Sequence, residues 1–272
     1  MKRPDFILGL DQNMSVESDL FLGRAYELGI TRISTPPNAN ITRFVDRFSK
    51  KSNCKVQTQF RLSPQGSAVN EIFEKTCETL GVNDLESFFF EDIEDIKNNP
   101  QSLVDLLELK KNGRLQNIGA IVSTEAAILA AAKIPALQVL QVSFNLFENS
   151  LKLGSSLKKA AEAGKTLQAK APFFEGLLTR PSGNLPEKFQ SLAPSLKKLK
   201  DLAGRSRITM ESLCLAYVLQ QKIFSAVIVS AESKDQLVKN WQSYQSASRL
   251  EIKSDEIHRI TQGDLQNIST AH

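Results

Sequence analysis

The sequence has few of the side chains that most often move protons in enzymes. It holds two histidines, His258 and His272, and three tyrosines, and none of them falls at the end of a predicted strand. Two histidines remote from the strand ends do not make a zinc site, which needs several ligands around one metal. Any acid–base chemistry therefore falls to carboxylates and lysine, with Glu91, Asp11 and Lys170 as candidates.

The sequence also lacks long apolar runs, a strong net charge and an even set of cysteines. No run approaches the roughly 20 apolar residues of a membrane span, and MKRPDFILGL is too short for a signal-peptide core, so no membrane association is expected. The net charge of +4 comes from lysines spread over predicted helices, which argues against nucleic-acid binding. Of Cys54, Cys77 and Cys214, the last two fit helical apolar patterns, so we expect reduced core cysteines in a cytoplasmic protein.

What the sequence does contain is a regular alternation of short apolar runs with helical segments. The runs are FILGL, RIST, KVQTQF, ESFFF, NIGAIV, LQVLQV, LQAKA and AVIVS. Several helical segments between them close on Gly29, Gly81 or Gly113, where glycine can take the left-handed conformation that ends a helix. Eight such units in 272 residues predict an α/β fold, a (β/α)8 TIM barrel, with residues 1–272 as one domain.

In such barrels the catalytic side chains lie at the C-terminal ends of the strands. Here the predicted strand ends carry Ser34, Gln59, Glu91, Ile121, Gln141, Lys170 and Ser230. Most of these residues have little chemistry of their own. The pattern therefore predicts an enzyme-like fold more firmly than it predicts a reaction.

Six segments, taken in chain order, resemble motifs of the aldo-keto reductase superfamily. They are AYELGITRISTPPNAN, LGVNDLESFFFE, LLELKKNGRLQNIGAIVS, LQVLQVSFNLFEN, AKAPFFEGLLTR and AVIVSAESKDQLVKN, and the likeness runs from Phe6 to Ile260. The stretches FNLF and LLTRPSGNLPEKF are similar to a short-looped bacterial branch often associated with surface-sugar biosynthesis. The resemblance implies a TIM barrel, a nicotinamide cofactor and carbonyl reduction.

The same resemblance places other residue types at all four positions of the family's reductive tetrad. That tetrad is Asp, Tyr, Lys and His: Tyr protonates the carbonyl oxygen, Lys and Asp tune the Tyr, and His orients the substrate. Here the four positions read Ser34, Ala39, Gln59 and Glu91. Losing the donor together with its supporting residues removes proton transfer and oxyanion stabilisation at once. The resemblance therefore implies the family's barrel without its tetrad.

The resemblance also implies where a nicotinamide dinucleotide would bind. The positions concerned are Gln141, Lys170, Ser230, Glu232, Ser233, Gln236 and Asn240. Gln141 stands where the family holds the carboxamide, whereas Lys170 replaces an aromatic residue that stacks on the nicotinamide ring. Glu232 replaces a basic residue that selects the 2′-phosphate, so NAD(H) is expected over NADP(H) if a nucleotide binds. Ser233 and Gln236 also have the spacing of a capping box, which explains this pair without any ligand.

Two features of the predicted barrel mouth have both a functional and a plainer interpretation. The acidic residues after the fourth strand, in EDIED, are either an oxygen-ligand site for Mg²⁺ or Ca²⁺ or, as we expect, a solvated loop, so no metal is assigned. A desolvated Lys170 can act as a nucleophile that forms a Schiff base. The plainer expectation is that Lys170 forms an ion pair with Glu91.

Two classes of function are compatible with these observations. The first is a non-catalytic or functionally diverged barrel, a pseudoenzyme, that binds a small-molecule ligand or a protein partner. The second is an NAD(P)(H)-dependent oxidoreductase acting on a sugar or related carbonyl compound in surface-polysaccharide metabolism, with Glu91 as an unrecognised acid. The replaced tetrad favours the first class.

Overall fold

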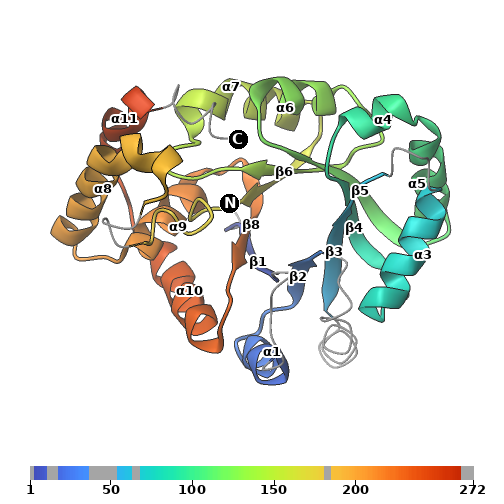
Figure 1. The fold of residues 1–272 in the computed structure, drawn as a ribbon, viewed down its shortest axis with the longest axis horizontal. Coiled ribbons are helices and arrows are strands. Elements are labelled where there is room, and N and C mark those ends of the chain that lie inside the picture. Colours follow the sequence, from blue (N-terminus) through green and yellow to red (C-terminus); the bar gives the residue numbers. More distant parts are fainter. Residues whose placement is uncertain (1–2, 11–17, 37–53, 63–67, 181–184, 265–272) are drawn as a thin grey trace.

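Eight parallel strands close into a barrel in the computed structural model, which describes residues 3–10, 18–36, 54–62, 68–180 and 185–264 (Figure 1). The strands are β1 (Asp5–Gly9), β2 (Arg32–Thr35), β3 (Lys55–Phe60), β4 (Leu85–Phe90), β5 (Leu115–Val122), β6 (Val139–Ser143), β7 (Thr166–Lys170) and β8 (Phe224–Ser230). They pair in chain order, and β8 pairs with β1, so the sheet has no free edge. The predicted barrel is confirmed, and each predicted run overlaps one of these strands.

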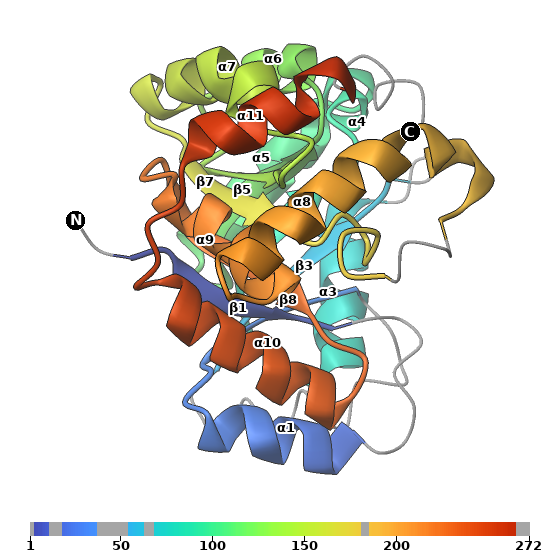
Figure 2. The ribbon, with the colours of Figure 1, turned by 90° about the vertical axis from the view of Figure 1, so that its left-hand side faces the viewer.

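Helices cover the outside of the barrel. They are α1 (Ser18–Glu27), α3 (Val69–Leu80), α4 (Glu94–Asn98), α5 (Gln101–Lys111), α6 (Glu125–Ala132), α7 (Ser150–Glu162), α8 (Ala193–Arg205), α9 (Met210–Gln220), α10 (Lys234–Ala247) and α11 (Ser254–Thr261), with a short 3-10 helix η2 (Glu187–Leu192) before α8 and another, η3 (Gln262–Asp264), after α11. Figures 1 and 2 show α10 beside α1 and α11 beside α8. Gly81 ends α3 with φ 65°, as predicted, and Gly29 and Gly113 are also left-handed. None of the helices in the described ranges is long and apolar enough to span a lipid bilayer.

The strand alternation divides side chains between the surrounding helices and the barrel interior. Outward residues of the strands pack with the helices in one large buried core. Ile7, Ala226 and Ile228 face inward from β1 and β8 and form a small cluster of their own. Between β3 and β7, which face each other across the barrel, the interior is polar: the side chains of Gln57 and Gln168 meet there and are no more than 2% exposed. The barrel interior therefore has an apolar part and an amide part.

Aromatic contacts anchor α10 on β1. The rings of Trp241 and Tyr244 share a helix face and meet Phe6 edge-on, with centroid separations of 5.1 and 5.0 Å. The Tyr244 hydroxyl donates to the Pro4 carbonyl at 2.8 Å. Burial raises the pKa of Tyr244 to about 12, so the phenol keeps the proton that this hydrogen bond needs.

The predicted core cysteines are buried among apolar residues. Cys77 on α3 and Cys214 on α9 both belong to the outer core. Burial raises the pKa of Cys77 to about 11 and also raises the pKa of Cys214. Both side chains therefore stay protonated thiols near neutral pH and behave as small apolar residues.

Helix α11 docks on the N-terminal end of α7 through polar contacts. Asn149, the residue that caps α7, donates to the Thr261 hydroxyl at 3.0 Å. His258 Nε2 lies 2.9 Å from the Tyr217 hydroxyl and 3.1 Å from the Ser150 hydroxyl. The histidine thus ties α11 to α9 and α7 on the outer ring of helices.

Candidate functional site

A chain of hydrogen bonds crosses the C-terminal mouth of the barrel from β3 and β4 to β7. The Lys170 amine donates to Gln59 Oε1 at 3.4 Å, and Gln59 Nε2 donates to Glu91 Oε1 at 3.0 Å. Arg61 Nε donates to the other oxygen of Glu91 at 3.2 Å. We call these four side chains the mouth chain. The structure brings together three residues predicted from strand ends and adds Arg61, which the sequence reasoning did not single out.

The predicted ion pair between Lys170 and Glu91 is wrong. Glu91 pairs with Arg61 instead, and no carboxylate of the described residues lies within 4.0 Å of the Lys170 amine. The reason is the amide of Gln59, which offers one acceptor and one donor group and so bridges the amine and the carboxylate. Burial lowers the pKa of Lys170, and the more distant Glu91 and Glu175 offset this only in part.

Beneath the mouth chain a second set of amide contacts joins the same opposite strands. Gln57 and Gln168 exchange two hydrogen bonds, at 3.2 and 3.3 Å, and Gln141 Nε2 donates to Gln168 Oε1 at 3.4 Å. We call these three residues the glutamine layer. Sequence reasoning missed Gln57 and Gln168, although strand alternation places them on the same faces as Gln59 and Lys170, two residues further along.

Three of the four tetrad positions lie in the described part of the chain. Ser34 is the residue before the last of β2, is half-buried and pairs with Gly9 of β1. Gln59 and Glu91 are hydrogen-bonded to each other. Ala39 lies outside the described residues, as does Asp11. The described positions thus offer a hydroxyl, an amide and a carboxylate whose two oxygens both accept hydrogen bonds.

The residues after β8 make their hydrogen bonds within the chain. Asn240 Nδ2 donates to the Ser230 carbonyl at 3.0 Å. Ser233 Oγ accepts from the Gln236 N–H at 3.2 Å, while Gln236 Oε1 accepts from the Glu232 N–H at 2.7 Å. This reciprocal pattern is the capping box that the spacing of Ser233 and Gln236 predicted. It provides acceptors for backbone N–H groups at the start of α10 that have no partner within the helix.

These contacts test whether the described residues fit a nicotinamide dinucleotide. Gln141 is 2% exposed and its Nε2 donates to Gln168, so this side chain is poorly accessible to a carboxamide. Lys170 offers no flat face for a nicotinamide ring, and the Glu232 amide that would meet a phosphate is already bonded. The described residues therefore do not fit the dinucleotide that the resemblance implies.

Each carboxylate of the acidic loop has its own protein partner. Asp92 Oδ1 accepts from the Glu94 N–H at 2.9 Å, and Glu94 pairs with Lys97 at 2.6 Å. Asp95 Oδ2 accepts from the Leu62 N–H at 3.4 Å. Because these carboxylates bond to separate donors and do not converge on one point, they are better described as a solvated acidic loop than as the ligands of a shared metal ion.

The turn after Lys170 has a strained backbone that is held by buried contacts. Ala171, Phe174 and Glu175 have φ angles of 53°, 50° and 52°, in the left-handed region that non-glycine residues seldom adopt. Phe174 is buried in the outer core, and Asn145 Nδ2 reaches the Ala171 carbonyl at 3.5 Å. These contacts fix the end of β7 and thereby the position of Lys170.

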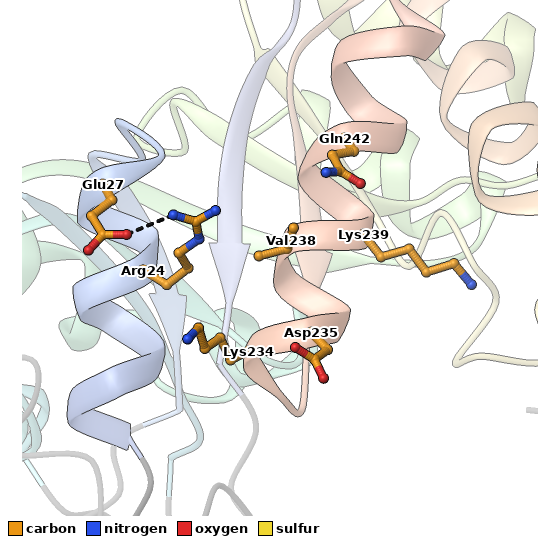
Figure 3. Close-up of a pocket in the computed structure, with 7 residues that line it drawn as sticks. All are labelled: Arg24, Glu27, Lys234, Asp235, Val238, Lys239 and Gln242. Atoms are coloured by element: carbon orange, nitrogen blue, oxygen red, sulfur yellow. Dashed lines mark hydrogen bonds and ion pairs between the residues drawn. The ribbon is translucent and has the colours of Figure 1, made fainter.

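A charged hollow of about 390 Å³ lies between α1 and α10, outside the barrel (Figure 3). Arg24 and Lys234 extend from the two helices toward the same gap, whereas Lys239 points away. Arg24 pairs with Glu27 at 2.7 Å, and Lys239 pairs with Glu211 of α9 at 2.6 Å. The lining comes from α1 and α10 alone, so this hollow is separate from the mouth chain.

Known proteins resemble the chain in both sequence and fold. The sequence profile of the Aldo/keto reductase family matches residues 48–264. Among solved structures, the chain is similar to an aldo-keto reductase enzyme from a Medee basin deep-sea metagenome library, with 16% identity over 96% of this chain and 91% of that one and a TM-score of 0.70. It is also similar to the aldose reductase from Schistosoma japonicum, with 17% identity, 96% and 89% coverage and a TM-score of 0.68. A search of curated proteins gives no match.

Proposed function

The chain belongs to the aldo/keto reductase family, and from this premise we propose that it is a barrel of that family which binds a ligand at its mouth but does not reduce carbonyl compounds. The observation that carries the proposal is the mouth chain. Gln59 and Glu91 stand at two positions where the resemblance expects catalytic residues, and they are hydrogen-bonded to each other instead.

The chemistry of these groups supports the loss of reduction. An amide such as that of Gln59 has no proton to give at neutral pH, and both oxygens of Glu91 accept hydrogen bonds. At Ala39, the position of the family's proton donor in the alignment, the side chain is a methyl group. A positioned general acid contributes about 10²–10⁴ in rate, and its supporting residues are replaced as well.

The poor fit to a dinucleotide supports the same proposal. Any nucleotide affinity that remains is weak and favours NAD(H), because Glu232 opposes a 2′-phosphate. The likeness of FNLF and LLTRPSGNLPEKF to the short-looped bacterial branch makes that branch the proposed sub-family. A sugar-related ligand is the corresponding proposal for what the barrel binds.

Two measurements on the purified chain test the proposal. Titration with NADH and NADPH, followed by nucleotide fluorescence, is expected to give little or no saturable change. Steady-state assays with simple aldehydes and aldoses are expected to show no nucleotide oxidation above the buffer rate. Tight nucleotide binding together with turnover that survives repurification contradicts the proposal and favours a reductase that uses Glu91 as its acid.

A further inference from the structure

Lys170 is placed in the mouth by the geometry of two opposite strands. Gln168, two residues earlier on β7, reaches across the interior to Gln57 of β3, so residues of this parity face inward. Lys170, two residues closer to the C-terminal end of β7, reaches across the barrel in the same way and contacts Gln59 of β3. The amine therefore lies over the centre of the barrel at its catalytic end.

The amine has weak partners for so enclosed a place. Its one hydrogen bond within the described residues is long, 3.4 Å, and goes to a neutral amide oxygen. The charged groups that face it are Glu91, which Arg61 already pairs, and Glu175, which is exposed. Burial lowers the pKa of the amine, so more of the neutral, nucleophilic form is present at neutral pH than on an exposed lysine.

We propose that Lys170 is a covalent binding site that forms a reversible imine with a small carbonyl compound. This inference rests on the proposed function, since it names the class of ligand held at the same mouth. The amine nitrogen attacks the carbonyl carbon and a C–N bond forms, giving a carbinolamine. The C–O bond then breaks, and the carbonyl oxygen leaves as water with the two amine hydrogens. The exchange needs no oxidant or reductant.

The surroundings of Lys170 select the rest of the ligand. A molecule that takes the amine away from Gln59 leaves the amide oxygen without its donor. Hydroxyl groups on the ligand restore that hydrogen bond, whereas an apolar ligand leaves the amide unsatisfied. Arg61, whose side chain is 72% exposed, adds further donors at the rim. The ligand class is therefore a small hydroxylated aldehyde or ketone.

Reductive trapping on the intact chain tests the inference. The protein is incubated briefly at pH 7 with glyceraldehyde or dihydroxyacetone and sodium cyanoborohydride, which reduces imines to stable amines, and modified lysines are mapped by mass spectrometry. We expect Lys170 to be modified about tenfold faster than Lys158, whose side chain is 77% exposed on α7. Lys170→Arg keeps the charge but cannot form the adduct, and its Lys158 modification is expected to be unchanged.

The possible outcomes separate this inference from the proposed function. If Lys170 is modified no faster than Lys158 in the wild-type chain, the covalent site is wrong. If the same probes also raise the unfolding temperature of both the wild type and Lys170→Arg, the mouth binds its ligand without a covalent bond and the proposed function stands. If the probes are reduced with oxidation of NADH or NADPH, the proposed function fails whatever the trapping shows.

Discussion

Removing the amide of Gln168 alone is expected to cost more stability than removing the amides of Gln168 and Gln57 together. Gln168 is the hub of this layer: it exchanges hydrogen bonds with Gln57 and also accepts from Gln141. Methionine has nearly the length and flexibility of glutamine, so Gln168→Met and Gln57→Met change hydrogen bonding with little change in packing. Both sites are buried, at 2% and 0% exposure, so water does not replace the lost partners.

The size of each effect follows from what is left without a partner. Gln168→Met leaves three buried groups without a partner: both polar atoms of Gln57 and the Nε2 of Gln141. Each such group costs about 1–3 kcal/mol, so a loss of at least about 3 kcal/mol is expected. Gln57→Met strands only Gln168 Nε2 and is expected to cost about 1–3 kcal/mol. The double variant strands only Gln141 Nε2, so its expected loss is again about 1–3 kcal/mol.

Urea unfolding of the wild type and the three variants, followed by circular dichroism, gives the four free energies of unfolding. The decisive comparison is between Gln168→Met and the double variant, which we expect to be the more stable of the two. Equal m-values are needed for that comparison, because a changed slope signals a changed native or unfolded state. If adding Gln57→Met to Gln168→Met lowers stability further, the reciprocal amide pair does not carry the energy assigned to it.

Three further predictions concern the nucleotide, the tetrad and the outer ring. Glu232→Arg is expected to strengthen NADP(H) binding more than NAD(H) binding in calorimetric titrations, and tight NADPH binding by the unmodified chain contradicts the role given to Glu232. Ala39→Tyr alone is expected to give no carbonyl reduction in a nucleotide-oxidation assay, because catalytic groups act as a unit. Substantial turnover by this variant means that the other tetrad positions are misassigned. Burial lowers the pKa of His258 below its ordinary value of 6.5, and Asp255 offsets part of this shift. The neutral histidine therefore contributes to stability above pH 6.5, and this contribution is lost as the pH falls through the pKa of the folded state. The wild type is therefore expected to lose more stability than His258→Gln between pH 7 and pH 5 in urea unfolding, and parallel pH profiles refute this account of the contact with Tyr217.

The barrel was predictable because its sequence signals are local and repeated. A strand such as RIST or KVQTQF shows itself by its apolar outward residues, which must meet the surrounding helices. Glycines such as Gly81 mark helix ends because few other residues adopt a positive φ. Each of these signals depends on a few neighbouring residues, and eight repetitions of them leave few alternative folds.

The mouth was only partly predictable because its contacts depend on distances across the barrel. The sequence placed Gln59, Glu91 and Lys170 at strand ends, but it did not say which side chains meet. Charge alone suggested an ion pair between Lys170 and Glu91. In the structure Glu91 pairs with Arg61 instead, because Arg61 directly follows β3 and lies within reach of Glu91. The glutamine layer was missed for a related reason: a glutamine within a strand has no local signal until its partner on the opposite strand is known.

The mouth chain and the glutamine layer have a mechanical consequence for the barrel. Both join β3 to β7, which lie on opposite sides of the closed sheet, so they act as two cross-braces on one diameter. Strand pairing holds a closed sheet around its circumference, and side-chain contacts across the interior add to its resistance to flattening. A molecule that draws Lys170 away from Gln59 removes the upper brace and leaves the lower one in place. A ligand that displaces Lys170 from Gln59 without replacing that hydrogen bond is therefore expected to leave the mouth end of the barrel less rigid than the glutamine layer beneath it.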